Sequence, residues 1–549
     1  MKKFFLLLAM FAGSVFSLGA DCTQGFLPII PQPLSVELND GGYRTGEDGI
    51  IYYYTENPVA SGKSVSFLKK YLSEYYDIEL KETGKKNKAD LRFCLASDSS
   101  RKEGAYTLSI TEEGVELSGY NEPGLFYATQ SLIQLLPCDG TAGREEAILL
   151  PCAEIYDEPR FSYRGMHLDV VRHIFPVEFV KKYIDYLALH KMNYFHWHLT
   201  DDQGWRMESR SHPRLNEYGS YREATIIGIF PGTGVDSTRY GGYYTVEQLE
   251  EIVDYAADRY ITIVPEIDIP AHSMAILSAY PQFGTEPGRK VKPAITWGIF
   301  NRQNNVLAPS EELFSFLEDV FNELMDVFPG KYIHIGCDEC APRWWQESEK
   351  VQDFIREHNL GDERGLHGYF AWRVGEIVKK RGRIPVGWDD ITKDKVPEGT
   401  TVMCWRGADN GYKAAAEGHQ VIMTPSRISY LNRMQRPGED SLCHRSLTTL
   451  EDVYKFDPVP DSIPAGIAEN IVGGQGCMWT EYFAYPSSVE YAVFPRMSAI
   501  AELYWTAADK KNWPLFLMKM PCQFRRYDLW GASSCKYVFE SELIPFNEE

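Results

Sequence analysis

The chain has 549 residues, of which 44% are hydrophobic, 24% charged and 13% aromatic, and its 77 acidic and 56 basic side chains give a formal net charge of −21 at pH 7. This composition is typical of globular proteins and excludes the disordered and fibrous classes. The acidic balance, without any long basic run, also argues against nucleic acid as a partner, because phosphate binding needs clustered lysine and arginine.

The first twenty residues differ from the rest of the chain. Lys2 and Lys3 precede an apolar run that ends at Phe16, and small residues follow up to Ala20, which is typical of a secretory signal peptide. We therefore expect an exported protein, periplasmic or secreted. A lipid anchor on Cys22 is the less favoured alternative, because the acidic residue before it suits lipoprotein cleavage poorly. No later run reaches about eighteen apolar residues, so we expect no transmembrane segment.

Residues 21–158 are predicted to form a small α+β domain. Short β-rich stretches alternate with helical patterns, the former at 50–55, 91–95, 106–110 and 115–117 and the latter at 64–76 and 124–136. Glu113 and Gly114 are expected to form a hairpin turn.

Residues 159–508 have a different rhythm, in which apolar runs alternate with amphipathic helical patterns. The eight runs are 165–170, 194–199, 262–269, 332–336, 384–388, 401–405, 421–424 and 472–479. Because parallel strands buried on both faces are continuously apolar, this pattern predicts an α/β fold, a (β/α)8 TIM barrel. Thr245 and Gln248 predict a capping box at the start of one barrel helix. Residues 200–244 are predicted to be a long loop.

Two segments show no clear pattern. Residues 427–471 are left unassigned within the barrel. Residues 509–549 are predicted to be a C-terminal extension packed on the barrel.

Polar and ionisable residues gather at the carboxyl ends of the first four runs, the end at which barrel enzymes have their active sites. They are Asp169, Arg172, His196, His198, Asp201, Asp202, Glu266, Asp268, His272, Asp338 and Glu339. Trp388, Trp405 and Trp479 close three later runs. Aromatic faces beside hydrogen-bonding groups suit a sugar ring, which is apolar on its C–H faces and polar at its rim.

Two reaction classes could use these residues. His196 and His198, with His272 and Asp338, could hold zinc for metal-assisted hydrolysis. Alternatively, a protonated carboxyl group could donate to the leaving oxygen of a glycoside. The metal hypothesis is the weaker one, because His196 and His198 share a face of their strand and could equally point into packed barrel layers. A glycan-binding protein without catalysis is a third alternative.

Five sequence motifs follow one another between about Arg160 and about Trp505. They are L-D-V-V-R (168–172), H-W-H-L-T-D-D (196–202), E-I-D-I-P-A-H (266–272), H-I-G-C-D-E (334–339) and G-C-M-W-T-E-Y (476–482). Together they resemble glycoside hydrolase family 20, the β-N-acetylhexosaminidases, and the preceding domain resembles the small α+β domain of that family. One departure is Cys337, where the family usually has a glycine. Cys337 and Cys340 are expected to be packed thiols rather than a disulfide.

The resemblance implies a retaining, exo-acting and substrate-assisted glycosidase without metal or cofactor. It implies that Glu339 is the general acid and base, that Asp338 binds the acetamido N–H, and that Tyr430 orients the acetamido oxygen. The carbohydrate partner would be a terminal N-acetylglucosamine, with N-acetylgalactosamine as a second candidate. The other implied site residues are Arg172 and Glu481 for the ring hydroxyls with Asn432 beside them, Trp388, Trp405 and Trp479 around the sugar, and Asp201 and His272 supporting the acidic pair. The sequence predicts no oligomeric state.

Overall fold

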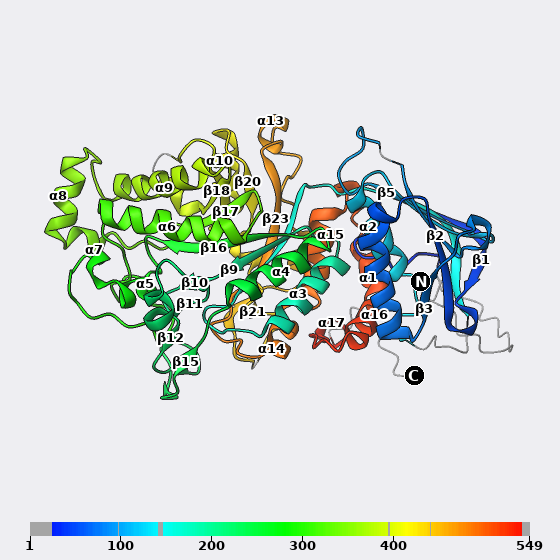
Figure 1. Cartoon of the computed structure of the whole chain (residues 1–549), viewed down its shortest axis with the longest axis horizontal. Helices are drawn as coiled ribbons and strands as arrows, with labels where there is room; N and C mark the ends of the chain where they lie inside the picture. The colour runs from blue at the N-terminus through cyan, green and yellow to red at the C-terminus, as the bar shows by residue number, and fades with distance from the viewer. Residues whose placement is uncertain (1–24, 97, 141–146, 394–395, 440, 541–549) are drawn as a thin grey trace, which may run out of the picture.

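Figure 1 shows the computed structural model of the chain, in which a closed barrel lies beside a smaller sheet domain. The structure describes residues 25–96, 98–140, 147–393, 396–439 and 441–540. The predicted signal peptide and Cys22 lie outside these residues. None of the described helices is long and apolar enough to cross a membrane.

The N-terminal domain is built on a seven-stranded mixed sheet with the strand order β1-β7-β5-β6-β4-β2-β3. Its strands are β1 (Ser35–Thr45), β2 (Ile50–Thr55), β3 (Glu79–Glu82), β4 (Leu91–Leu95), β5 (Tyr106–Thr111), β6 (Gly114–Gly119) and β7 (Ile148–Asp157). The predicted α+β class is confirmed, but the sequence prediction missed β1, β3 and β7. The β5–β6 hairpin pairs Thr111 with Gly114, so its turn lies one residue earlier than predicted.

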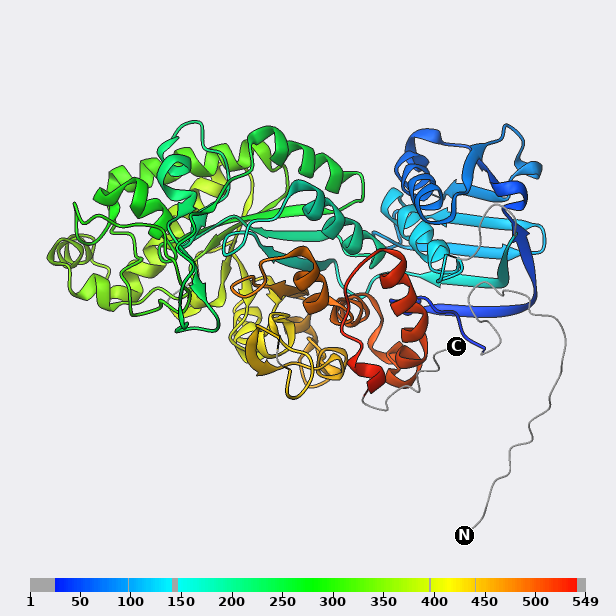
Figure 2. The ribbon, with the colours of Figure 1, turned by 90° about the horizontal axis from the view of Figure 1, so that it is seen from below.

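Two helices cover the face of this sheet that is turned toward the barrel (Figures 1 and 2). They are α1 (Pro58–Tyr76) and α2 (Glu122–Ile133). The side chain of Asn57 caps α1 by accepting from the Ala60 N–H, and Pro58 follows where no N–H is needed. Lys70 on α1 donates to Asp185 and Tyr255 of the barrel helices at 3.3 and 3.1 Å.

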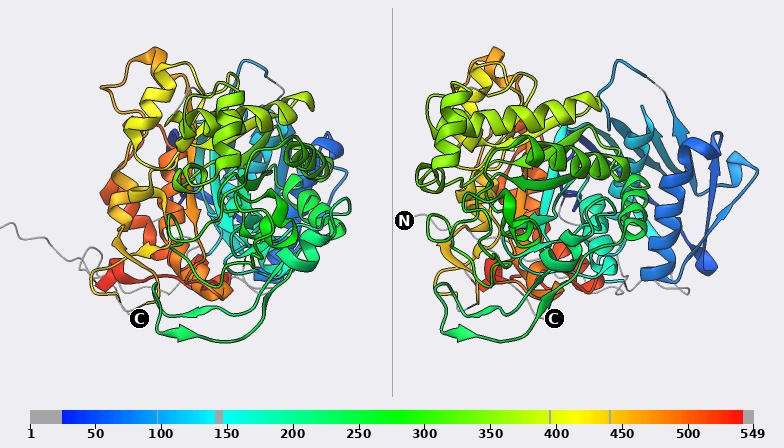
Figure 3. Two further views of the ribbon diagram at one scale, coloured as in Figure 1. Left: turned by 90° about the vertical axis from the view of Figure 1, so that its left-hand side faces the viewer. Right: turned by 60° about the vertical axis from the view of Figure 1, so that its left-hand side comes forward.

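The barrel has eight parallel strands in the closed order β16-β17-β18-β19-β20-β23-β8-β9, which confirms the predicted TIM barrel. They are β8 (Tyr163–Asp169), β9 (Tyr194–His198), β16 (Thr262–Ile269), β17 (Tyr332–Gly336), β18 (Ile384–Trp388), β19 (Thr401–Cys404), β20 (Val421–Met423) and β23 (Ile471–Met478). Figure 3 views the barrel from the side away from the N-terminal domain.

Helices surround these strands as the amphipathic patterns predict. They include α3 (Val177–Leu189), α4 (Val246–Ala257), α6 (Glu311–Val327), α9 (Glu363–Lys380), α10 (Ala408–Ala416), α14 (Pro486–Val493) and α15 (Arg496–Trp505). The predicted capping box opens α4, with the Thr245 hydroxyl accepting from the Gln248 N–H and the Gln248 side chain accepting from the Thr245 N–H. Short helices lie in the connections, namely α5 (Met274–Ala279), α7 (Arg343–Gln346) and α8 (Glu349–Glu357).

The segment 200–244 is mostly irregular, as predicted, but it folds back on itself. Its two-residue strands are β10 (Thr200–Asp201), β11 (Gly204–Trp205), β12 (Tyr221–Arg222), β13 (Ile226–Ile227), β14 (Gly234–Val235) and β15 (Tyr240–Gly241). The buried Arg206 guanidinium holds it against the barrel by donating to the carbonyls of Val170, Val171 and Ser220.

The unassigned segment 427–471 contains only short elements. They are α11 (Ser426–Ser429), β21 (Arg433–Met434), β22 (His444–Leu447), α12 (Leu450–Lys455) and α13 (Ala465–Ala468). Elements of this length carry too little periodicity for recognition from sequence.

The described part of the C-terminal extension, residues 509–540, contains α16 (Trp513–Leu529) and α17 (Tyr537–Glu540), and the predicted residues 541–549 lie outside the described residues. It packs on the barrel, where Tyr527 and Ser498 share a hydrogen bond of 2.6 Å. It also touches the N-terminal domain, because Trp530 donates to the Tyr71 hydroxyl at 3.0 Å.

A buried polar cluster joins the N-terminal domain to the barrel. The Asp157 carboxylate, at the end of β7, accepts from Tyr106 at 2.7 Å and from Lys191 and Trp505 at 3.0 Å each. Lys191 follows α3, and Trp505 ends α15. Since Asp157 and Lys191 are at most 1% exposed, this ion pair ties three elements together in the protein interior.

Candidate active site

The polar residues predicted at the strand ends lie in one layer at the carboxyl end of the barrel. Strand register explains this placement, because Asp169 pairs with His198, and Glu266 pairs with both His198 and His334. All four are buried. Their side chains therefore have to find hydrogen-bond partners within the protein rather than in water.

Arg172 is the cation at one side of this layer. Its guanidinium contacts Asp169 at 3.1 Å and Asp201 at 2.8 Å, and donates to Gln203 at 3.0 Å. It also lies 5.1 Å from the centre of the Trp479 ring. Burial would lower the pKa of Arg172, but Asp201 and Asp169 keep it well above its ordinary value. The arginine is thus fixed in place beside the aromatic wall.

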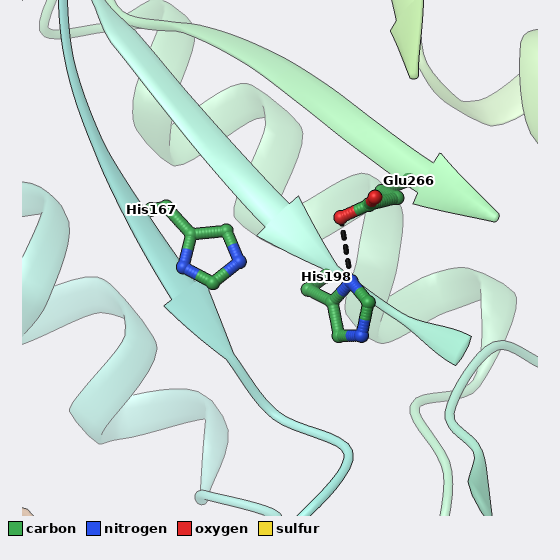
Figure 4. A group of neighbouring side chains, drawn as sticks. All are labelled: His167, His198 and Glu266. Atoms are coloured by element: carbon green, nitrogen blue, oxygen red, sulfur yellow. Dashed lines mark hydrogen bonds and ion pairs between the residues drawn. The ribbon is translucent and has the colours of Figure 1, made fainter. Parts of the chain in front are cut away.

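The side chains of His196 and His198 are buried in the barrel, and Figure 4 shows His198 reaching the Glu266 carboxylate. His198 contacts Glu266 at 2.5 Å through Nδ1 and Asp201 at 2.8 Å through Nε2. Although burial would lower the pKa of His198, the two carboxylates raise it to about 10. His196 contacts Glu266 at 3.0 Å and accepts from Gln475 at 2.8 Å.

The contacts of His196 and His198 do not fit the metal hypothesis. Several groups of histidines and carboxylates are close enough to hold an ion, and His167, His198 and Glu266 form one of them (Figure 4). However, a metal needs a free imidazole lone pair. Both ring nitrogens of His196 and of His198 already serve hydrogen bonds within the protein.

The acidic pair Asp338-Glu339 lies just after β17, where the backbone leaves strand geometry. Cys337 and Glu339 have φ angles of 73° and 43°, in the left-handed region that side chains rarely adopt. Neighbours on a regular strand point to opposite faces. The bend turns both acids toward His272, whose Nε2 lies 3.7 Å from Asp338 and 3.5 Å from Glu339.

His272 lies between the acidic pair and two further carboxylates. Its Nδ1 lies 3.0 Å from Asp201 and 3.1 Å from Asp202. Burial would lower the pKa of His272, but Asp201 and Asp338 raise it well above its ordinary value. The imidazolium ring therefore links the layer of Arg172 and His198 to the acidic pair.

The two acids of the pair differ in exposure. The Asp338 side chain is 14% exposed and that of Glu339 is 41% exposed. Burial raises the pKa of Asp338 to about 7, with the nearby Glu339 adding to the shift and His272 opposing it. Asp338 is therefore the inner acid and Glu339 the outer one.

The three predicted tryptophans form a wall and floor beside Asp338. Trp388 is 1% exposed and donates to Glu266 at 2.7 Å, so it is a floor rather than an open surface. Trp405 donates to Asp390 at 2.9 Å and faces Tyr430 with a ring separation of 6.3 Å. Trp479 lies between Trp388 and Tyr430, with its ring 5.9 Å from each of their rings.

Asn432 and Glu481 lie together at the edge of the layer. The Asn432 amide donates to the Glu481 carboxylate at 3.3 Å. Burial raises the pKa of Glu481, and the neighbouring Arg172 opposes this. The structure thus brings together the residues that the sequence predicts for the site.

Sequence reasoning missed two contributors to this arrangement. Gln203 orients Arg172, and Asp390 orients Trp405. Gln203 directly follows Asp202, and Asp390 lies two residues after the run 384–388, so closeness to a predicted strand end is a usable signal. Asp169 was recognised at its strand end, but its role as the partner of Arg172 requires the tertiary structure.

A cavity of about 800 Å³ lies at the opposite end of the barrel. It is bounded by residues of both domains, such as Tyr127, Arg164 and Tyr194, and by none of the predicted site residues. Volume alone therefore points away from the ionisable layer, and the chemistry of the side chains is the better guide to function.

Comparisons with known proteins identify the family of both domains. Residues 161–508 match the catalytic domain of glycosyl hydrolase family 20, and residues 27–158 match domain 2 of that family. A β-hexosaminidase of Porphyromonas gingivalis is 40% identical over 79% of this chain, and the match spans 54%, about half, of that protein's length. A β-hexosaminidase of Vibrio furnissii is 33% identical over 86% of this chain and 76% of its own.

A solved structure is similar over nearly the whole chain. The exo-β-N-acetylglucosaminidase of Vibrio harveyi, in complex with N-acetylglucosamine, has a TM-score of 0.82 and 30% identity, over 93% of this chain and 78% of its own. The family match covers well over half of the residues in the chain. The chain therefore belongs to glycosyl hydrolase family 20.

Proposed function

We propose that the protein is an exo-acting β-N-acetylhexosaminidase that releases terminal β-linked N-acetylglucosamine by substrate-assisted catalysis. The observation that carries the proposal is that Asp338 and Glu339 both face His272, in a site that also brings the rings of Trp388 and Trp479 together. The names of the relatives as β-hexosaminidases support the same activity.

The first step uses the acetamido group of the sugar as the nucleophile. Its carbonyl oxygen attacks the anomeric carbon while the glycosidic C–O bond breaks, and the proton on Glu339 moves to the leaving oxygen. The product on the enzyme is an oxazolinium ring with one positive charge. The Asp338 carboxylate accepts a hydrogen bond from the N–H of this ring and stabilises its charge, and Tyr430 orients the carbonyl oxygen.

The second step reverses these roles. Glu339, now a carboxylate, takes a proton from a water molecule that attacks the anomeric carbon, and the ring opens to regenerate the acetamide. Two inversions at one carbon give net retention of configuration. Glu339 suits this exchange with substrate and water because it is the more exposed acid of the pair.

The charges of the layer favour a cationic intermediate. Three cations, Arg172, His198 and His272, face three carboxylates whose pKa values are lowered, Asp169, Asp201 and Glu266. The charges of these six groups balance. An ionised Asp338 adds a negative charge to this balanced set, and that charge stabilises the oxazolinium.

Arg172 and Glu481 are proposed to hold the ring hydroxyls, with Asn432 beside them. A fixed guanidinium fork and a carboxylate can bind vicinal hydroxyls from opposite sides. Recognition of a terminal sugar in this way makes the enzyme exo-acting. The same groups would contact the hydroxyl at position 4, so N-acetylgalactosamine is the second candidate substrate.

The test compares two chromogenic β-glycosides that differ only at position 2, an acetamide and a hydroxyl. We expect turnover of the acetamide and at most a trace with the hydroxyl. Equal turnover would rule out substrate assistance. Full activity after exhaustive chelation would remove the metal alternative, and loss of turnover with retained sugar binding in Glu339→Gln would remove the non-catalytic one.

Export is proposed on the signal-peptide character of the first twenty residues. Fractionation of cells that express the full chain tests it. Activity confined to the cytosol, with the N-terminus intact by mass spectrometry, would refute export.

A further inference from the structure

Two buried carboxyl oxygens at the heart of the site have no hydrogen-bond partner among the described residues. They are Oδ1 of Asp268 and Oδ1 of Asp338. Asp268 is 1% exposed and takes no part in the reaction proposed above. A buried polar atom without a partner is costly, so this pair of oxygens requires an explanation.

The two carboxyl groups lie close together and Asp268 is confined. An oxygen of Asp268, an oxygen of Asp338 and a ring nitrogen of His272 all lie within 4.8 Å of one another. A Cβ added at Gly336 would lie 1.7 Å from Oδ1 of Asp268. The backbone of β17 therefore packs directly on this carboxyl group. The Asp268 N–H donates to the Thr200 hydroxyl at 3.0 Å, which fixes its own backbone.

Asp268 is surrounded by titratable side chains from its own strand and from the neighbouring strands and loops. The titratable groups that face it are His198, Asp201, Glu266, His272, Cys337 and Asp338. Burial and the adjacent Asp338 raise the pKa of Asp268 well above its ordinary value, against the effect of His272. Two ionised carboxylates within 4.8 Å of each other in a buried setting would repel each other. One proton held between them would instead give both orphan oxygens a hydrogen-bond partner.

We propose that Asp268 is a positioning residue that keeps a proton and donates it in a hydrogen bond to the carboxylate of Asp338. This inference rests on the proposed function, because it assigns Asp338 the ionised state that the oxazolinium needs. The proton stays on Asp268 throughout, so no bond to it breaks in the reaction. The hydrogen bond fixes one oxygen of Asp338 and leaves the other to accept the substrate N–H.

The test uses two variants of the full-length chain. Asp268→Asn keeps an N–H donor, whereas Asp268→Leu has a similar size and no donor. Loss of a hydrogen bond to a charged group costs about 10- to 100-fold. We therefore expect a loss of this size in kcat for Asp268→Leu, with a smaller change in KM, and a loss below about tenfold for Asp268→Asn.

The direction of the pH shift separates a proton donor from a charged neighbour. A hydrogen bond to an ionised group lowers the pKa of that group. Its loss in Asp268→Leu should move the acid limb of kcat/KM to higher pH, while Asp268→Asn should stay near the parent. If Asp268 were ionised, both variants would relieve repulsion and move the limb to lower pH. A shift to lower pH, or no shift in Asp268→Leu, would overturn the proposal.

Two further measurements guard against a misfolded variant. Glu502→Gln is the matched control. Glu502 is also a buried acid, 1% exposed and with a raised pKa. Its carboxylate lies outside the site and accepts a hydrogen bond from the Gln32 N–H. The pH profile of this variant should match the parent. Carbon-13 spectra of side-chain-labelled aspartate should lose one protonated-carboxyl signal at pH 7 in Asp268→Asn, and loss of an ionised signal instead would contradict the proposal. This spectrum is independent of turnover, so it distinguishes failure of this inference from failure of the proposed function.

Discussion

Replacement of Asp338 by asparagine isolates the charge that stabilises the intermediate. The variant keeps the size of the side chain and an oxygen that can accept the acetamido N–H, so only the negative charge is lost. Because the Asp338 side chain is 14% exposed, an effective dielectric constant of about 20 is appropriate. At about 4 Å, a carboxylate and a cationic ring then interact by roughly 4 kcal/mol. This energy corresponds to about a thousandfold loss of kcat.

The assay is steady-state hydrolysis of 4-nitrophenyl N-acetyl-β-D-glucosaminide, with KM determined in parallel. KM should change little, since the hydrogen bond to the neutral substrate is retained. Thermal unfolding and the Glu502→Gln variant serve as controls for folding. A loss of kcat below about tenfold in a folded protein would refute the reasoning, because Asp338 would then carry no charge in the transition state.

Three further predictions concern the proton donor, pH and the domain interface. Glu339→Gln should lower kcat by about 10²- to 10⁴-fold for an alkyl glycoside. The loss should be smaller for a 4-nitrophenyl glycoside, because 4-nitrophenolate can leave without a proton. Equal losses with the two substrates would contradict the role of Glu339 as general acid. Since Asp338 must be ionised and its pKa is about 7 in the free enzyme, kcat/KM should fall as pH drops through 7. The bound acetamido N–H favours the ionised form, so the acid limb of kcat should lie at lower pH, and coincident limbs would speak against Asp338 binding the acetamide. Asp157→Ala leaves the buried Lys191 charge without its ion-pair partner and should reduce the free energy of unfolding by about 3–5 kcal/mol. A change below about 1 kcal/mol in chemical denaturation would mean that the stability of the interface does not depend on this pair.

The barrel and the position of its site were predictable from sequence because both follow local pattern. Each barrel strand is buried on both faces and reads as an apolar run, as at 262–269. The capping box at Thr245 is likewise a local interaction, and the structure has it as predicted. Residue type at the strand ends then placed Arg172, His272 and the acidic pair at one end of the barrel.

The missed strand β1 of the N-terminal domain has a different physical cause. The strand β1 is an edge strand whose residues are mostly exposed, so its sequence is polar and carries no apolar run. Its pairing with β7 also shifts register between Leu38 and Gly42. An edge strand of this kind is specified by its partner rather than by its own pattern.

The electrostatics of the site also required the tertiary structure. The sequence shows His198 only as one residue of an H-x-H motif, which suits either a metal or a packed layer. Its charge state depends on Glu266, which is 68 residues away in the chain, and on Asp201. The left-handed backbone at Cys337 and Glu339 is equally invisible in sequence, although it turns the acidic pair toward one substrate.

The most direct test of the central claim varies the nucleophile within the substrate. In a series of β-glycosides with an N-acetyl, N-fluoroacetyl, N-difluoroacetyl or N-trifluoroacetyl group, each fluorine withdraws electron density from the carbonyl oxygen. If that oxygen attacks the anomeric carbon, kcat/KM should fall progressively along the series while the leaving group stays constant. A rate that does not change along the series, or a covalent glycosyl ester on the protein by mass spectrometry, would contradict substrate-assisted catalysis.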